Sequence, residues 1–583
     1  MALIGIDLGT TNSLVSVWRD GKVEVIKNSL GHIMTPSVVS LEEGGRILVG
    51  EIAKQRRISH PLYTASEFKR SMGTRKEYVL AHKRYYPEDL SAFLLKKLVE
   101  DTQDALGEDV TECVISVPAY FDDNQREATK RAARIAGIEV KRLINEPSAA
   151  IIYHQWKFGN TGREGIYLVI DFGGGTLDVS VVDCFENIIE ILSISGDNKL
   201  GGKDFDRYLA EDFCKRFDLK FSKLDKHTKE NLLWIAEKVK RGLSQEESVT
   251  MRAIIEQKEY VAEYSKDELL KVTAPLLLKM KEVINEALRG ARVETAQIVD
   301  IVLVGGTCKM PLIQKYLSAL FHRDVVADED CEQLVALGVG VLTGIIGRNE
   351  EVCDIVMTDV CPFSLGTGTY HNKVDSVLYM SVIIPKNSIL PISKSGVYYG
   401  LEKFQKQIKF EIFQGEELHA KDNLSLGCLF VDVTPNEIGD TCAKVTFCYD
   451  INGVLQVYAQ DMYGDNTAEM VVVSKSFQLS DEEIELRKID MEKEQRFEKN
   501  KEENRHILAW GQRLFAQANP EYKDYIAGIV NDFAYHVEQN DIAMVQRTKK
   551  GIIEQLLALE KVVNRDYFEN EDVITKLLEE EDD

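Results

Sequence analysis

The sequence has no stretch of 18 or more consecutive apolar residues, so we expect no membrane-spanning helix. It opens on a strand-like run, without the charged and apolar regions of a secretion signal. Positive charge is also scarce, because 71 Lys and Arg stand against 95 Asp and Glu, a net charge of −24. This balance argues against nucleic acid and anionic membranes as partners.

The ten cysteines are scattered and form no CxxC pair. We therefore expect free thiols in a reducing cytoplasm rather than a zinc or disulfide framework. The length of 583 residues predicts three or four domains, at about 150 residues each.

Two glycine-rich bends stand out among the features that are present. Asp171–Asp178 reads DFGGGTLD between two strand-like runs, and Asp7–Ser13 reads DLGTTNS after another. Glycines allow a ligand close to the backbone N–H groups, which suit a phosphate chain, and the aspartates suit a divalent cation.

The segments around these bends repeat in the same order. The strand-like runs 3–8, 14–18 and 23–26 recur as 166–171, 177–182 and 188–194, and the run 112–117 with helix 122–136 recurs as 301–304 with a helix after Pro311. The chain thus contains an internal duplication.

This duplicated pattern resembles the actin-like ATPase fold, an α/β fold of two lobes built on a duplicated ribonuclease H-like unit. Longer motifs resemble the DnaK-type 70 kDa heat shock protein chaperones: Ile6–Ser13, Asn145–Ala150, Asp171–Ser180 and Val302–Thr307. The resemblance runs from residue 3 to at least residue 475, and several departures are closest to the specialised bacterial HscC branch.

Four regions follow from this pattern and resemblance. We expect a nucleotide-binding ATPase domain at 1–352, a linker at 353–359, an antiparallel β-sandwich for peptide binding at 360–478 and a helical lid at 479–583. Alternation in Gln407–Phe413 and the Asn452-Gly453 turn predict the sandwich. Ser480–Glu483 resembles a capping box, Pro520 can open a helix, and Ile542–Val563 keeps an apolar stripe. A coiled-coil dimerisation arm is the alternative for the last region. We expect the acidic end Glu579–Asp583 to be a solvated tail.

The resemblance assigns roles in ATP hydrolysis with Mg²⁺, for which K⁺ is a candidate second cation. It implies Lys69, Glu146, Asp171, Thr176 and Asp178 as catalytic, and Asp7 and Asp171 as Mg²⁺ residues acting largely through water. The implied nucleotide-binding residues are Gly9, Thr10, Thr11, Asn12, Gly173, Gly174, Gly175, Gly201, Gly202, Glu237, Lys240, Arg241, Ser244, Gly305, Gly306, Lys309 and Glu332.

Four of these residues, Glu237, Lys240, Arg241 and Ser244, share one face of a predicted helix. That pattern alone favours a solvated stripe, whereas the resemblance implies adenosine binding. Lys309 stands where the family usually has arginine and Glu332 where it usually has aspartate. Lysine stacks less well on a base, so we expect a lower nucleotide affinity.

For peptide binding, the resemblance implies Thr367, Tyr398, Leu401, Ile408 and Phe410, although each also suits a sandwich core. Thr367 stands where an apolar residue is common in the family, which predicts weaker binding of leucine-rich peptides.

For communication between domains, the resemblance implies Arg142, Pro147 and Asp359. Thr358 departs from a leucine-rich linker, so we expect weaker docking of this segment.

The leading hypothesis is an ATP-dependent molecular chaperone that binds exposed apolar segments of unfolded chains. The expected partners are a J-domain cochaperone and a nucleotide exchange factor. Two alternatives stay open: a small-molecule kinase on the same fold, and a hydrolysis-poor holdase or exchange factor.

Overall fold

The computed structural model describes residues 2–42, 45–158, 164–349, 351–352, 355–370, 377–450, 453–472, 481–494, 499–518, 520–539 and 542–563. The predicted linker residue Asp354, the turn residue Asn452, the capping residue Ser480 and the acidic end 579–583 lie outside these described residues.

The first lobe is built on a sheet with the order β11-β10-β1-β2-β3. Its strands are β1 (Leu3–Asp7), β2 (Asn12–Arg19), β3 (Lys22–Ile26), β10 (Glu112–Val117) and β11 (Glu139–Asn145). β1 pairs antiparallel with β2 and parallel with β10. Asp20 and Gly21 both have positive φ angles at the β2–β3 turn, as the predicted hairpin requires.

The second lobe repeats this topology in the order β17-β12-β13-β14-β18. The strands are β12 (Gly165–Phe172), β13 (Leu177–Phe185), β14 (Ile188–Asp197), β17 (Ile298–Val304) and β18 (Val356–Thr358). β12 pairs antiparallel with β13 and parallel with β17, as β1 does with β2 and β10. The predicted duplication is therefore confirmed in the strand order.

Helices α4 (Glu146–Phe158) and α9 (Leu334–Ile346) pack on each other between the two sheets. Helix α4 follows the first sheet but packs on β12 and β13 of the second, and α9 follows the second sheet but packs on β1 and β2 of the first. This exchange connects the lobes through a shared apolar core.

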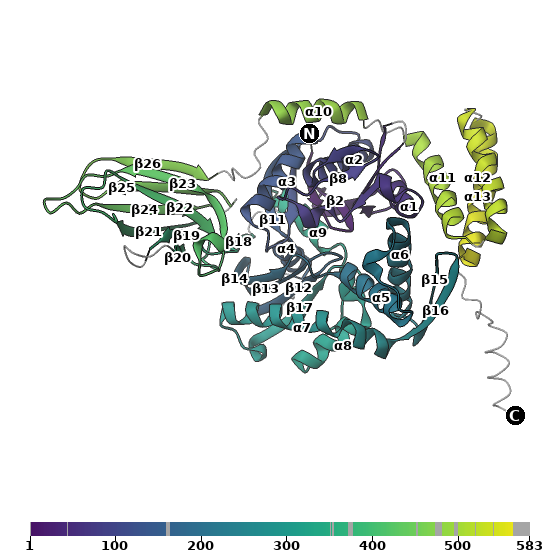
Figure 1. Ribbon diagram of the computed structural model, residues 1–583, viewed down its shortest axis with the longest axis horizontal. Coiled ribbons are helices and arrows are strands. Elements are labelled where there is room, and N and C mark those ends of the chain that lie inside the picture. The colour runs from purple at the N-terminus through teal and green to yellow at the C-terminus, as the bar shows by residue number, and fades with distance from the viewer. Residues whose placement is uncertain are drawn as a thin grey trace.

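The other helices surround these sheets (Figure 1). They are α1 (Glu51–Ser59), α2 (Pro87–Leu106), α3 (Asp123–Ile135), α5 (Gly202–Arg216), α6 (Lys226–Gly242), α7 (Lys266–Ala291) and α8 (Pro311–Phe321). Short strands complete the lobes: β4 (Thr35–Pro36), β5 (Val38–Leu41), β6 (Ile47–Val49), β7 (Thr64–Ser66), β8 (Tyr78–Leu80), β9 (Lys83–Tyr85), β15 (Ser248–Ile255) and β16 (Lys258–Ser265). No helix within the described segments is long and apolar enough to cross a membrane.

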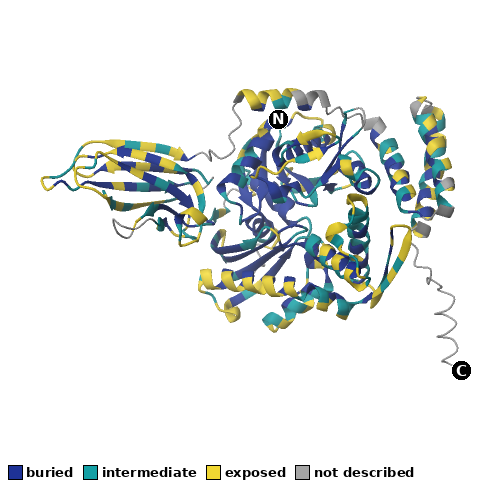
Figure 2. Cartoon of the chain, in the orientation of Figure 1, coloured by how far each residue is buried: buried dark blue, intermediate teal, exposed yellow. Residues whose placement is uncertain are grey.

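Two four-stranded antiparallel sheets form the predicted β-sandwich. One contains β19 (Leu365–Thr369), β20 (Tyr379–Ile384), β22 (Gln407–Gln414) and β23 (Leu424–Asp432); the other contains β21 (Ile392–Tyr399), β24 (Cys442–Tyr449), β25 (Leu455–Asp461) and β26 (Thr467–Val472). Buried and exposed residues alternate along these strands (Figure 2), so each sheet has one apolar face.

The C-terminal region is helical, with α10 (Asp481–Glu494), α11 (Lys499–Gln517), α12 (Pro520–Glu538) and α13 (Ile542–Val563). Helices α11–α13, here named the C-terminal bundle, share an apolar core that includes Leu514, Phe533 and Leu556. The apolar face of Ile542–Val563 is thus buried within the same chain. This removes the main reason to expect a dimerisation arm. The bundle lies beside α1 and α6 rather than over the sandwich (Figure 1).

Candidate nucleotide site

The two predicted glycine-rich bends meet between the lobes. A Cβ atom on Gly174 would lie 2.3 Å from Cγ2 of Thr11, and one on Gly175 would lie 2.4 Å from Cγ2 of Thr10. Neither distance is sterically possible, so glycine is required where one hairpin approaches the other.

Beside the hairpins lies a cavity of about 600 Å³, lined from both lobes and here named the interlobe cavity. All the residues predicted for catalysis, Mg²⁺ and nucleotide line it, except Gly175, Asp178 and Gly201. These three stand directly behind its wall: Gly175 packs on Thr10, Gly201 packs on Gly174, and Asp178 is fully buried and accepts the Tyr120 N–H at 3.1 Å.

Four acidic side chains gather at the cavity, three of them in its lining and Asp178 directly behind it. Burial and the nearby Glu146 carboxylate raise the pKa of Asp7 and of Asp178 to about 7, and raise the pKa of Asp171 well above its usual value. Carboxylates that resist ionisation in this way favour a bound cation. Asp7 also accepts a hydrogen bond of 2.8 Å from Ser116.

These carboxylates fit a magnesium ion held mainly through water. Mg²⁺ prefers oxygen ligands and usually retains several waters. In the described part of the chain, no three acidic, histidine or cysteine side chains lie close enough to hold an ion directly.

Lys69 provides the buried positive charge. It lies in the 3₁₀ turn η2 (Phe68–Ser71), and its Nζ donates to Oε1 of Glu146 at 2.5 Å. Both side chains are buried in the cavity wall, where an ion pair is screened little by solvent. The lysine and the carboxylate predicted to act on the attacking water therefore come together, although they are 77 positions apart.

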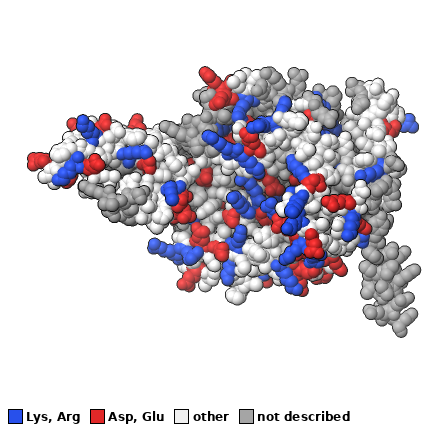
Figure 3. Space-filling model, viewed as in Figure 1, with Lys and Arg blue, Asp and Glu red and all other residues white. Residues whose placement is uncertain are grey.

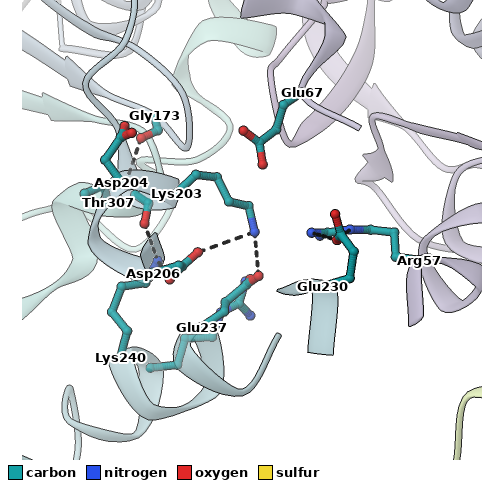
Figure 4. A network of polar contacts seen from close by, with 12 residues as sticks. Arg57, Glu67, Gly173, Lys203, Asp204, Asp206, Glu230, Glu237, Lys240 and Thr307 are labelled. Atoms are coloured by element: carbon teal, nitrogen blue, oxygen red, sulfur yellow. Dashed lines mark hydrogen bonds and ion pairs between the residues drawn. The ribbon is translucent and has the colours of Figure 1, made fainter. Parts of the chain in front are cut away.

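A second polar network lies at the mouth of the cavity (Figure 4). Lys203 donates to Glu237 at 2.6 Å, and Lys240 pairs with Asp206 at 2.7 Å. Burial opposes ionisation of Glu237, but Lys203 and then Arg241 lower its pKa below the usual value. Glu237 is therefore an acceptor at neutral pH.

One geometric prediction for this wall was wrong. Helix α6 ends at Gly242, so Ser244 lies beyond it and not on the predicted helical face. The turn that follows α6 still brings Ser244 to the cavity.

The two departures from the family pattern contact each other. Lys309 Nζ lies 2.6 Å from a carboxylate oxygen of Glu332, and both line the cavity. The lysine head group is thus already held beside the site.

The sequence analysis missed two residues near the cavity: Arg70, which joins the lobes, and Lys203, which joins α5 to α6 within the second lobe. Arg70 donates to the Gly175 carbonyl at 2.8 Å and to Asp204 at 2.5 Å. Lys203, which joins Glu237 to Asp206, was also missed. The only available signal was the position of Arg70 beside Lys69 and of Lys203 after Gly201-Gly202.

Two of the predicted interdomain residues, Arg142 and Asp359, lie close together at the predicted linker. β18 pairs in parallel with β14, with Ile188 opposite Val356 and Glu190 opposite Thr358. Asn145 donates to Asp359 at 2.8 Å. Burial lowers the pKa of Arg142, although the nearby Asp359 carboxylate acts in the opposite direction. Asn145 is the further functional candidate here, because it immediately precedes Glu146.

Pro147 is buried as the second residue of α4, directly after Glu146. A rigid residue at this point fixes the start of the helix that carries Glu146.

The predicted peptide-binding residues lie in the sandwich. Ile408 and Phe410 are buried on the inner face of β22, Tyr398 packs edge-to-face on Phe410 with ring centres 5.6 Å apart, and Leu401 is exposed. The Thr367 hydroxyl donates to the Glu411 carbonyl at 2.9 Å. Because this hydroxyl is already paired, it places no unsatisfied polar group in the sandwich.

Two lobes with a duplicated sheet and a charged interlobe cavity define an actin-like ATPase domain, here followed by a β-sandwich. A family model described as "Hsp70 protein" matches residues 3–81 and 76–566. Similar curated proteins include "Chaperone protein DnaK" of Thermosipho melanesiensis, 35% identical over 569 residues that cover 93% of this chain and 94% of the relative. "Chaperone protein DnaK" of Thermotoga petrophila is 36% identical over 497 residues, covering 83% and 82% of the two chains.

The chain belongs to the Hsp70 family. It is therefore an ATP-hydrolysing molecular chaperone, and the kinase alternative is not favoured.

Proposed function

We propose that ATP bound in the interlobe cavity controls the affinity of the sandwich for extended apolar segments of unfolded chains. Two consecutive residues carry this proposal. Glu146 pairs with Lys69 in the cavity, and Asn145 holds Asp359 at the end of the linker. A change at the γ-phosphate that moves Glu146 can therefore reach the linker through the adjacent Asn145.

For hydrolysis, Lys69 and Glu146 orient the attacking water, and Thr176 and the glycine backbone hold the phosphates. Asp7 and Asp171 would hold Mg²⁺, which offsets the charge on the β- and γ-phosphates. The buried carboxylates accept this cation readily because their mutual repulsion is then relieved.

The present arrangement of the domains supports an open, ATP-type state. The linker strand is paired with β14, and the C-terminal bundle lies on the nucleotide-binding domain (Figure 1). In this proposal hydrolysis releases the linker, and α10–α13 then act as the lid over a bound peptide. The residue bounds 1–352, 353–359, 360–478 and 479–583 belong to the same proposal.

A J-domain cochaperone that stimulates hydrolysis, an exchange factor, a K⁺ ion and a bacterial cytoplasmic location complete the proposal. The departures at Lys309, Thr358 and Thr367 favour a specialised member of the family, such as the HscC branch.

The test is single-turnover ATP hydrolysis by Lys69→Ala. Loss of one group from a preorganised site costs about 3 kcal/mol, so hydrolysis should fall about a hundredfold while ATP still binds. Lys76→Ala, at an exposed lysine of the same segment, is the matched control. A Lys69→Ala rate within about threefold of wild type would reject the role of Lys69.

A second measurement follows ATP turnover with a model peptide and a J-domain protein. Stimulation by both supports a switching chaperone. A turnover that neither changes would support the hydrolysis-poor holdase instead.

A further inference from the structure

The C-terminal bundle contacts both lobes of the nucleotide-binding domain. Helix α11 packs along α1 of the first lobe, where Ala509 joins Leu48 and Ile52 in a small apolar cluster. At its C-terminal end, Gln517 donates to Asn231 of α6 in the second lobe at 3.3 Å. The bundle therefore bridges two elements that are separate in the sequence.

Arg513 is the centre of this bridge. Its side chain is 2% exposed and donates to Gln55 of α1 at 2.6 Å and to Glu560 of α13 at 2.6 Å. Its guanidinium also lies 5.0 Å from the ring centre of Trp234 in α6. One buried cation thus contacts the first lobe, the second lobe and the bundle.

The two helices that Arg513 joins also line the interlobe cavity. α1 contributes Arg57, and α6 contributes Glu237, three positions after Trp234. Arg57 further pairs with Glu230 of α6 at 2.8 Å, so α1 and α6 meet at the mouth of the cavity (Figure 4). Parting α1 from α6 would break this ion pair and the contacts of Arg513 together.

A second buried group fixes α11 to the first lobe. Lys97 of α2 contacts Glu502 at 2.7 Å and Asp101 at 2.9 Å, and Glu502 also accepts from Ser29. The N-terminal half of α11 is therefore held on the first lobe, while Arg513 and Gln517 extend its contacts to the second. Lys and Arg are interspersed with Asp and Glu on the face shown in Figure 3, whereas the contacts of Arg513 and Lys97 are buried.

We propose that the docked C-terminal bundle holds the two lobes together across the mouth of the cavity and so slows the release of nucleotide. Undocking of the bundle then speeds release. The chain in this way contains a control of nucleotide exchange within its own C-terminal region. The inference rests on the proposed nucleotide site, because the cavity must be where the bound ATP leaves.

The experiment measures release of a fluorescent, slowly hydrolysed ATP analogue from the full chain after addition of excess unlabelled ATP, because the bundle is docked in the proposed ATP-type state. Arg513→Ala removes the bridge, and Trp234→Leu removes only its contact with the second lobe. Release should be at least about fivefold faster in both variants. This factor is the lower end of the coupling that is typical between two sites. Arg547→Ala, at an exposed arginine of the same bundle, should stay within about twofold of wild type.

Unchanged release in Trp234→Leu would overturn the inference, whether or not Arg513→Ala folds. Unchanged circular dichroism establishes that each variant keeps its helices. Failure of the wild-type chain to bind the analogue would instead count against the nucleotide site itself, so the two failures are distinguishable.

Discussion

Thr358→Val should tighten the docking of the linker. The Oγ1 atom of Thr358 is buried and has no hydrogen-bond partner among the described residues. A buried hydroxyl without a partner costs about 1–3 kcal/mol, and valine replaces it with a methyl group of nearly the same shape. A gain of about 2 kcal/mol corresponds to an increase of about thirtyfold in the docking equilibrium.

Hydrogen exchange of the linker peptide with ATP present measures this docking. The Val356 N–H donates to the Asn187 carbonyl at 2.9 Å, so its exchange rate reports how often β18 leaves β14. Exchange should slow in Thr358→Val and stay unchanged in Thr467→Val, an exposed threonine-to-valine control in β26. Equal or faster exchange in Thr358→Val would refute the reasoning, because the hydroxyl would then have a satisfied partner.

Three further predictions follow from buried or paired side chains. Burial raises the pKa of Asp123 from 3.8 to about 6 where it meets Tyr449 of the sandwich, so its stabilisation of the folded, docked form is complete below pH 3.8 and is lost as pH rises through 6. Asp123→Asn should abolish that part of the pH dependence, as measured by hydrogen exchange of β24. Lys309→Arg should bind ATP several-fold more tightly by calorimetry, since arginine stacks better and can keep its pair with Glu332. Phe410→Ala should destabilise the sandwich by about 3–5 kcal/mol in thermal unfolding, because this ring is 2% exposed in its core.

The repeated hairpins were predictable because their signals are local. Glycines at a bend, Asp20-Gly21 between two strands, and alternation in Gln407–Phe413 each determine backbone geometry within a few residues. The helix that follows β10 also begins where predicted, since Asp122 caps it by accepting from the Gln125 N–H at 2.9 Å.

The missed residues depend on contacts between distant segments. Arg70 meets Asp204 across 134 positions, and Asn145 meets Asp359 across 214 positions. Neither spacing has a periodicity that a single sequence can reveal. The position of the C-terminal bundle was missed for a similar reason. The sequence around Arg513 has no local pattern from which its distant contact with Gln55 could be predicted.

The domain interfaces differ in kind from the domain cores, and this difference suits reversible docking. The sandwich and the bundle each have their own apolar core, so we expect both to remain folded when they separate from the ATPase lobes. Their contacts with those lobes include buried polar pairs, such as Asp123–Tyr449, Lys97–Glu502 and Arg513–Gln55.

Burying such groups has a large desolvation cost that nearly offsets their attraction, which leaves a small net free energy of docking. When the free energy of docking is only a few kcal/mol, binding of a nucleotide or a peptide can reverse the docking equilibrium. Helix α10 differs, because Ile484 and Met491 join the large apolar core of the first lobe, whereas Ala509 of α11 joins only a small cluster. We therefore expect α10 to leave the first lobe last, after the bundle and the linker have been released.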